Sequence, residues 1–239
     1  MSAAQLALPF DPEPSYAAED FIDAAANEAA RAWLARPGEW PSGRLALWGP
    51  AGSGKTHLLR LWARRHGAEL LDGAALDPGL LPGLPARKLA VDNADAAPEL
   101  VLLRLLNLAA EAGQSLLLAS RLPPGRWDVA LPDLASRLRA VTTAEIGAAD
   151  DDTLRLLLQH LLLDRQLAVG LAVQEHLLRH LPRTPAALRR AAALLDGAAL
   201  AAGGKVTRRI ADAAIAALAE DDDTMNGAAE ASSAAPPIV

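Results

Sequence analysis

The sequence contains no cysteine, so it can form neither a disulfide nor a thiolate metal site. This absence fits a reducing compartment, and we expect a cytoplasmic protein. Aromatic residues make up only 3% of the 239 residues, whereas hydrophobic residues make up 51%. Alanine and leucine therefore supply most of the apolar content, which favours helices. The length allows one medium domain and one smaller domain, each with its own core.

Long apolar runs and a positive net charge are also missing. The most apolar stretch, residues 154–163, is interrupted by Arg155, Gln159 and His160, so it is not expected to span a bilayer. No basic segment leading into an apolar one marks a signal peptide. The formal net charge is −6, whereas tight non-specific DNA binders are usually basic. We therefore expect no membrane association and no direct sequence-specific DNA binding, although a local basic patch is not excluded.

Short apolar runs alternate with helical patterns through residue 146. The runs predict five strands, at residues 44–48, 69–71, 88–92, 115–120 and 141–146. Helices are predicted at residues 19–34, 55–66 and 99–112, and Gly67 and Gly113 end the last two. This alternation predicts an α/β fold with a parallel five-stranded sheet and helices on both faces.

The composition changes after Gly147, and the remaining periodic segments are all helical. They lie at residues 151–166, 172–181, 185–201 and 208–219, and Thr184-Pro185 suits a helix start. We therefore predict an N-terminal arm (1–15), an α/β domain (16–146), a small all-helical domain (147–220) and a tail (221–239). The tail is acidic and then rich in Ala, Ser and Pro, so we expect it to be disordered.

A glycine-rich motif between the first strand and the next helix matches G-x-x-x-x-G-K-[ST] without a mismatch. Its glycines let backbone N–H groups converge on phosphate oxygens, the lysine neutralises the β and γ phosphates, and the threonine hydroxyl binds Mg²⁺. The plain alternative is a glycine-rich turn with a chance lysine. The motif predicts binding of ATP or ADP by Gly49, Pro50, Ala51, Gly52, Ser53, Gly54, Lys55 and Thr56.

An acidic residue ends the third predicted strand, where phosphate loops of this kind need a carboxylate to reach Mg²⁺. Asp92 is that residue, and the alternative is a helix cap or surface turn. Fast ATPases usually carry Glu at the next position, but Asn93 stands here and cannot act as a base. Asp95 is close in sequence and is expected to point elsewhere. We therefore expect nucleotide binding with weak or no intrinsic hydrolysis.

These features together resemble the branch of the AAA+ proteins that contains the DnaA and Hda families. The phosphate loop is the general match, and Val91-Asp92-Asn93 looks like the Asp-Asn variant found in the Hda family. The resemblance implies the AAA+ P-loop NTPase fold, in which the helical domain is a lid over the nucleotide. The resemblance covers residues 5–218 and does not extend to the helix-turn-helix domain with which DnaA reads its origin boxes. We therefore do not expect an initiator role.

Residues 131–138, Leu-Pro-Asp-Leu-Ala-Ser-Arg-Leu, look like the Hda segment that carries an arginine finger. By this match Arg137 is the finger, and it would act in trans on ATP held by a neighbouring DnaA subunit. A guanidinium suits the role because it is always charged and its fork fits a phosphate. The plain alternative is a surface arginine in a loop.

The N-terminal residues 5–10, Gln-Leu-Ala-Leu-Pro-Phe, resemble the peptide by which Hda docks on the β sliding clamp. Apolar side chains would fill a pocket of the clamp, and the Gln5 amide would fix the register. The alternative is an ordinary tail. The residues assigned to clamp binding are Gln5, Leu6, Leu8, Pro9 and Phe10.

The sequence departs from the family at two places. Ser120-Arg121 ends the fourth strand where relatives often carry an acid, and Ser120 is retained as a candidate polar sensor. The arginine with which the lid touches nucleotide falls on Ala186, which leaves Arg183, Arg189 or Arg190 as substitutes or as a solvated helix face.

The resemblance implies an adaptor that docks on the DNA polymerase III β sliding clamp and stimulates hydrolysis of DnaA-bound ATP. This activity would regulate replication initiation negatively. The rival functions are an independent AAA+ ATPase of the helicase-loader type and a DnaA-like initiator acting on DNA. Homo-oligomerisation stays open. His176 and His180 are one helical turn apart but lack the adjoining Glu of a zincin motif, so we do not expect a metal site there.

Overall fold

The computed structural model describes residue 16 and residues 21–83, 88–201 and 205–219. The chain divides into two compact units, one formed by residues 12–150 and the other containing the residues from Asp151 onward. The predicted clamp peptide, Gln5 to Phe10, lies outside the described residues, as does the predicted tail from Asp221 to Val239.

The first unit is built on five parallel strands in the order β2-β3-β4-β1-β5. Each predicted strand is present with ends shifted by no more than a residue. The strands are β1 (Arg44–Trp48), β2 (Glu69–Asp72), β3 (Leu89–Asp92), β4 (Leu116–Ser120) and β5 (Thr142–Glu145). Because all five are parallel, their carboxyl ends meet at one edge of the sheet.

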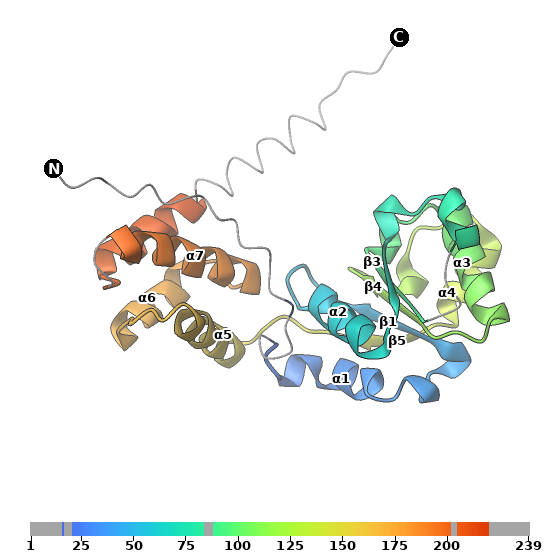
Figure 1. Cartoon of the computed structure of the whole chain (residues 1–239), viewed down its shortest axis with the longest axis horizontal. Coiled ribbons are helices and arrows are strands. Elements are labelled where there is room, and N and C mark those ends of the chain that lie inside the picture. The colour runs from blue at the N-terminus through green and yellow to red at the C-terminus, as the bar shows by residue number, and fades with distance from the viewer. Residues whose placement is uncertain (1–15, 17–20, 84–87, 202–204, 220–239) are drawn as a thin grey trace, which may run out of the picture. The chain divides into compact units, whose positions relative to one another are not determined.

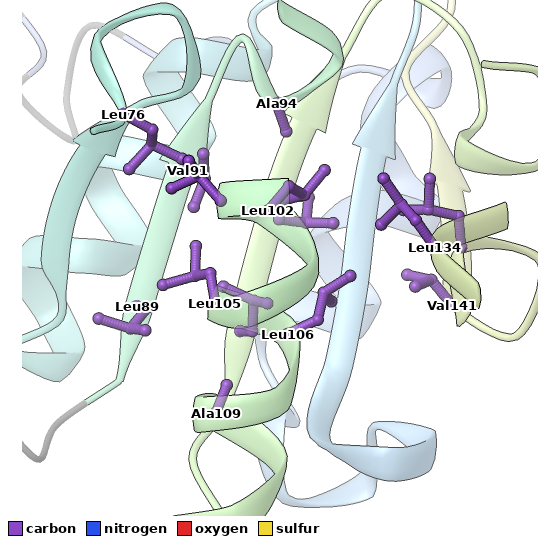
Figure 2. Packing of buried hydrophobic residues seen from close by; sticks show 14 of the residues in the cluster. Leu76, Leu89, Val91, Ala94, Leu102, Leu105, Leu106, Ala109, Leu134 and Val141 are labelled. Carbon is purple, nitrogen blue, oxygen red and sulfur yellow. The ribbon is translucent and has the colours of Figure 1, made fainter. Parts of the chain in front are cut away.

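Helices cover both faces of this sheet, as the sequence predicts (Figure 1). Leu45, Leu47 and Leu117 point to the face packed by α1 (Glu28–Leu34) and α2 (Lys55–His66). The alternate residues Ala46 and Leu118 point to the face packed by α3 (Glu99–Glu111) and α4 (Pro132–Arg139). Figure 2 shows this second face, where Leu102, Leu105 and Leu106 of α3 lie over the middle of the sheet and Leu134 of α4 lies beside β1, near Val141. Both faces of the sheet are thus buried by helices, which explains why the strands are nearly continuous apolar runs.

The first helix begins later than predicted. The sequence predicts a helix from residue 19, but α1 starts at Glu28, after a 3-10 turn at Ala25–Asn27. Ala24 is extended, and its N–H donates to the Asn27 side chain, which in turn donates to the carbonyl of Ile22. These bonds hold the chain in a non-helical path, so alanine content alone gives the wrong start.

The sequence analysis also misses one helix. Residues 132–139 form α4, with Pro132 at its first turn and with Leu134 and Leu138 buried one turn apart. Arg137 lies in the last turn of this helix and not in a loop, and its assignment as an arginine finger stays a prediction.

The second unit is helical. It contains α5 (Asp151–Asp164), α6 (Leu171–His180), α7 (Pro185–Ala201) and a further helix at residues 208–219. Leu158, Leu177 and Leu195 are fully buried in it. The His176 Nε2 lies 2.5 Å from an Asp212 carboxylate oxygen, and this contact ties α6 to the last helix. Among the described residues no helix combines the length and the apolar character that crossing a bilayer requires.

Candidate nucleotide site

The phosphate-loop motif lies at the carboxyl edge of the sheet, between the end of β1 at Trp48 and the start of α2 at Lys55. Three of its glycines adopt positive φ: 155° at Gly49, 75° at Gly52 and 100° at Gly54. Residues other than glycine rarely adopt these φ values. Loops that combine such glycines with a following helix N-terminus direct backbone N–H groups toward a bound anion.

Two glycines are also required by close packing. A Cβ on Gly49 would lie 2.1 Å from the Ile146 carbonyl oxygen, and one on Gly54 would lie 3.3 Å from the Phe21 ring. Phe21 also contacts the ring of His57 edge-on, with centroids 5.2 Å apart. Phe21 thus packs against both the last glycine of the loop and the first turn of α2.

The Lys55 ammonium group lies across the loop. Its Nζ donates to the carbonyls of Gly49 (2.8 Å) and Pro50 (2.7 Å). Burial lowers the pKa of Lys55 below its ordinary value of 10.5; Asp92 and Asp95 oppose this shift, and Arg121 adds to it. Lys55 is thus held at the loop by two bonds, and its buried charge favours an anionic partner there.

Asp92 ends β3 at the same edge, where its carboxylate accepts a hydrogen bond from the N–H of Asn93 (3.0 Å). The Asp95 carboxylate accepts from the N–H of Arg121 (3.2 Å), which follows β4. The negative charges of both carboxylates raise the pKa of Lys55 and so favour its protonated form. The 3-10 turn at Ala94–Ala96 directs Asp95 toward the end of β4, where Arg121 holds it, so its absence from the position of the catalytic acid stays a prediction.

The Asn93 side chain is directed along the sheet edge. Its Nδ2 donates to the Asp72 carboxylate at the end of β2 (3.2 Å), and its φ of 48° is one that asparagine tolerates. Asn93 therefore helps join β2 to β3. As an amide it has no basic oxygen with which to take a proton from water.

The residues of the loop fit a bound phosphate group. The Ser53 Oγ is buried, and it has no hydrogen-bond partner within the part of the chain that the structure describes. A phosphate oxygen at the loop would satisfy this hydroxyl. Thr56, in the first turn of α2, and Asp92 supply the oxygen ligands that Mg²⁺ prefers.

The structure also describes the two places where the sequence departs from the family pattern, Ser120 and the arginines near Ala186. Ser120 is 2% exposed, and its hydroxyl donates to the Leu122 carbonyl (2.7 Å), so it is engaged by its own turn. In the helical unit Ala186 is exposed in the first turn of α7. Arg183 pairs with Asp151 within the same unit. Arg189 and Arg190 also have interaction partners.

Arg137 lies in the last turn of α4. Its Nε donates to Asp133 (3.2 Å), and its side chain is 36% exposed. Burial lowers the pKa of Arg44, the first residue of β1, and the positive charge of Arg137 lowers it further. The charged groups that act on Lys55 are those of Asp92, Asp95 and Arg121, and among the described residues no interaction joins Arg137 to Lys55.

Sequence reasoning also missed Tyr16 and Phe21, which contact α2. The Tyr16 ring lies edge-on to His57 with centroids 5.5 Å apart, and the Arg60 guanidinium lies 4.1 Å from the Tyr16 ring centroid. Arg64 donates to the Tyr16 carbonyl (3.0 Å). Aromatic residues are so scarce in this chain that Tyr16 and Phe21 could have been singled out, although no motif says what they contact.

The parallel five-stranded sheet with this loop defines the fold of the AAA+ P-loop NTPases. The structure is similar to domain III of the replication initiation protein DnaA from Thermotoga maritima, with a TM-score of 0.69 at 18% identity over 84% of this chain and 96% of that one. It is also similar to AMPPCP-bound DnaA from Aquifex aeolicus (TM-score 0.58, 18% identity, 71% of this chain and 61% of that one).

A third similar structure is the Thermotoga maritima RuvB Holliday junction branch migration motor, with a TM-score of 0.61 at 18% identity, covering 81% of this chain and 67% of that one. This chain spans less than two thirds of the longer DnaA chains it resembles. No protein-family model matches the sequence, and no curated protein matches it either. At these sequence identities the similarity establishes the fold alone.

Proposed function

We propose that the chain binds ATP or ADP with Mg²⁺ at the phosphate loop formed by residues 49–56. The observation that carries this proposal is the glycine loop between β1 and α2, which has positive φ at Gly49, Gly52 and Gly54. Lys55 lies across this loop, and Asp92 ends β3 at the same edge of the sheet. Backbone N–H groups and Lys55 would bind the β and γ phosphates, while Thr56 and Asp92 would hold the metal. The AMPPCP-bound DnaA structures among its structural neighbours support the same ligand class.

Calorimetry on the pure protein tests this step. ADP and ATP, each with Mg²⁺, are titrated into the wild-type chain and into Lys55→Met. Saturable heat in the wild type and none in the variant is expected. If neither nucleotide binds the folded wild-type protein, the proposed site is wrong.

We further propose that the nucleotide-bound chain acts as an adaptor toward DnaA at the β sliding clamp. Arg137 would enter the nucleotide site of a DnaA neighbour, and residues 5–10 would dock on the clamp. Two observations support a role in trans: among the described residues no interaction joins Arg137 to Lys55, and Asn93 lacks the base of a self-sufficient ATPase. A cytoplasmic location belongs to the same proposal.

The adaptor proposal is tested by hydrolysis of DnaA-bound ATP in the presence of clamp loaded on DNA. Wild-type chain, Arg137→Ala and Leu8→Ala are compared at equal concentrations. Stimulation by the wild type and its loss in both variants is expected. Equal stimulation by all three proteins would rule out both assigned surfaces.

The second candidate is a self-sufficient ATPase acting on DNA. The similarity to a RuvB motor favours it, and so does the distribution of charge. Five of the 29 acidic residues and none of the 23 basic ones lie in residues 220–239, so residues 1–219 carry a formal charge of only −1. Rapid ATP turnover by the isolated chain, together with strongly salt-dependent DNA binding, would favour this candidate over the adaptor.

A further inference from the structure

The helical unit contains a cavity of about 350 Å³ between α5, α6 and the segment after α6. Leu154 and Leu178 form apolar parts of its wall. Three guanidinium groups line it, those of Arg155, Arg179 and Arg183, together with two acidic residues, Asp151 and Glu175. Every lining residue belongs to this one unit.

The charges of the cavity are incompletely balanced. Arg183 pairs with Asp151, and Arg155 pairs with Asp152 (2.8 Å). Arg179 donates from Nε to the Glu175 carbonyl (3.3 Å), and within the described residues no carboxylate pairs with its guanidinium. The cavity therefore offers a cationic group beside apolar wall, a combination that suits carboxylates carried on a peptide rather than a small inorganic anion.

The same chain carries a peptide of this chemistry. Glu220, Asp221, Asp222 and Asp223 form an acidic run directly after the helix at residues 208–219, and Met225 follows two residues later. These four acids account for most of the net charge of −6. Charge complementarity and the adjacent Met225 thus make this run the best-matched occupant that the sequence offers.

The last helix contacts α6, which forms part of the cavity wall. Asp212, on that last helix, contacts His176, and His176 is three residues before Arg179 on α6. The helix continues for seven residues beyond Asp212, about 10 Å at 1.5 Å per residue, and extended chain then adds about 3.3 Å per residue. A tether of this length corresponds to an effective concentration near the millimolar range, so even a weak contact between the run and the cavity would form within one molecule.

We propose that the cavity lined by Arg155, Arg179 and Arg183 is a binding site for acidic peptide segments, and that residues 220–225 of this chain occupy it. An acidic segment of a partner would have to displace this run in order to bind. The proposal does not depend on nucleotide binding, because every residue it uses lies in the helical unit or the tail.

The absence of cysteine allows a clean test on the full chain. A nitroxide is attached at Asn226→Cys, and the paramagnetic loss of amide peak intensity is measured by NMR. Peaks of residues 151–155 and 175–183 are expected to lose intensity. Arg179→Glu, and separately Asp221→Asn, Asp222→Asn and Asp223→Asn combined, are expected to restore them.

Two matched controls remove charge elsewhere. Arg104→Glu makes the same charge change on α3 in the other unit, and Glu230→Gln removes a tail charge outside the run; neither is expected to restore the peaks. A synthetic peptide of residues 219–226 added in excess is expected to displace the tail and restore them. If the labelled wild type shows no loss at these peaks, or if the loss persists in both charge variants, the proposal is wrong.

Discussion

Gly49 and Ile146 approach so closely that the first glycine of the phosphate loop has no room for a side chain. A Cβ on Gly49 would lie 2.1 Å from the Ile146 carbonyl oxygen. The Ile146 N–H donates to the Trp48 carbonyl (2.7 Å), so the end of β5 holds the start of the loop directly. The loop's path therefore depends on the edge strand as well as on its own glycines.

We expect Gly49→Ala to destabilise the first unit by about 2–3 kcal/mol, through the clash and the positive φ. Thermal unfolding should fall by several degrees, and nucleotide binding should be lost. Gly38→Ala is the matched control, because a Cβ there meets nothing within 4 Å. A Gly49→Ala protein that melts and binds nucleotide like the wild type would contradict the described loop geometry.

The sequence predicts the phosphate loop and α2 well because the signals are local. Gly54 and Gly67 flank α2, and both adopt positive φ, so glycine sets each end of the helix. The strands are predictable for a similar reason, since burial on both faces makes them short continuous apolar runs.

The elements that were missed depend on contacts between distant residues. The start of α1 is set by Asn27 bonding back to Ile22, and the position of Asp95 is set by the N–H of Arg121, which is 26 residues away. The eight-residue α4 buries only Leu134 and Leu138, which is too little periodicity to predict a helix. Hydrophobic periodicity predicts neither the position of Lys55 across its loop nor the arginine-lined cavity.

Replacing Lys55 should separate stability from binding. Burial lowers the pKa of Lys55, so the charged ammonium is less favourable in the folded protein than in the unfolded chain. We expect Lys55→Met to melt within about 3 °C of the wild type, or above it, while its affinity for ATP falls at least about 100-fold. Thermal unfolding and calorimetry on the same samples check both parts.

The pH dependence of this effect has a definite sign. Because the folded-state pKa of Lys55 is lowered, the unfolded chain binds more protons between that value and 10.5. Lys55 therefore contributes a stability that rises with pH through this window. The difference in melting temperature between Lys55→Met and the wild type should shrink as pH is raised toward 10.5, and an increasing difference would refute the assignment.

Replacing Ser53 should affect the free energy of unfolding and the nucleotide affinity in opposite directions. Its buried Oγ has no partner among the described residues, so Ser53→Ala removes an unsatisfied hydroxyl. We expect the unfolding free energy to stay unchanged or to rise by about 1 kcal/mol, and nucleotide affinity to fall about tenfold because a phosphate contact is lost. Unaltered affinity would mean that Ser53 does not face the phosphates.

Arg137 and Arg139 provide the sharpest test of action in trans, because both arginines lie in the last turn of α4. Arg137 is half-buried and bonded to Asp133, whereas Arg139 is exposed. An arginine finger typically contributes 10³–10⁵-fold to hydrolysis. We expect Arg137→Ala to lower the stimulated hydrolysis of DnaA-bound ATP by at least about 100-fold, and Arg139→Ala to leave it unchanged. Since no interaction among the described residues joins Arg137 to Lys55, both variants should bind ATP with wild-type affinity. An Arg137→Ala protein that loses its own nucleotide would instead indicate a role within its own chain, and equal loss in both variants would indicate damage to α4 rather than removal of a finger.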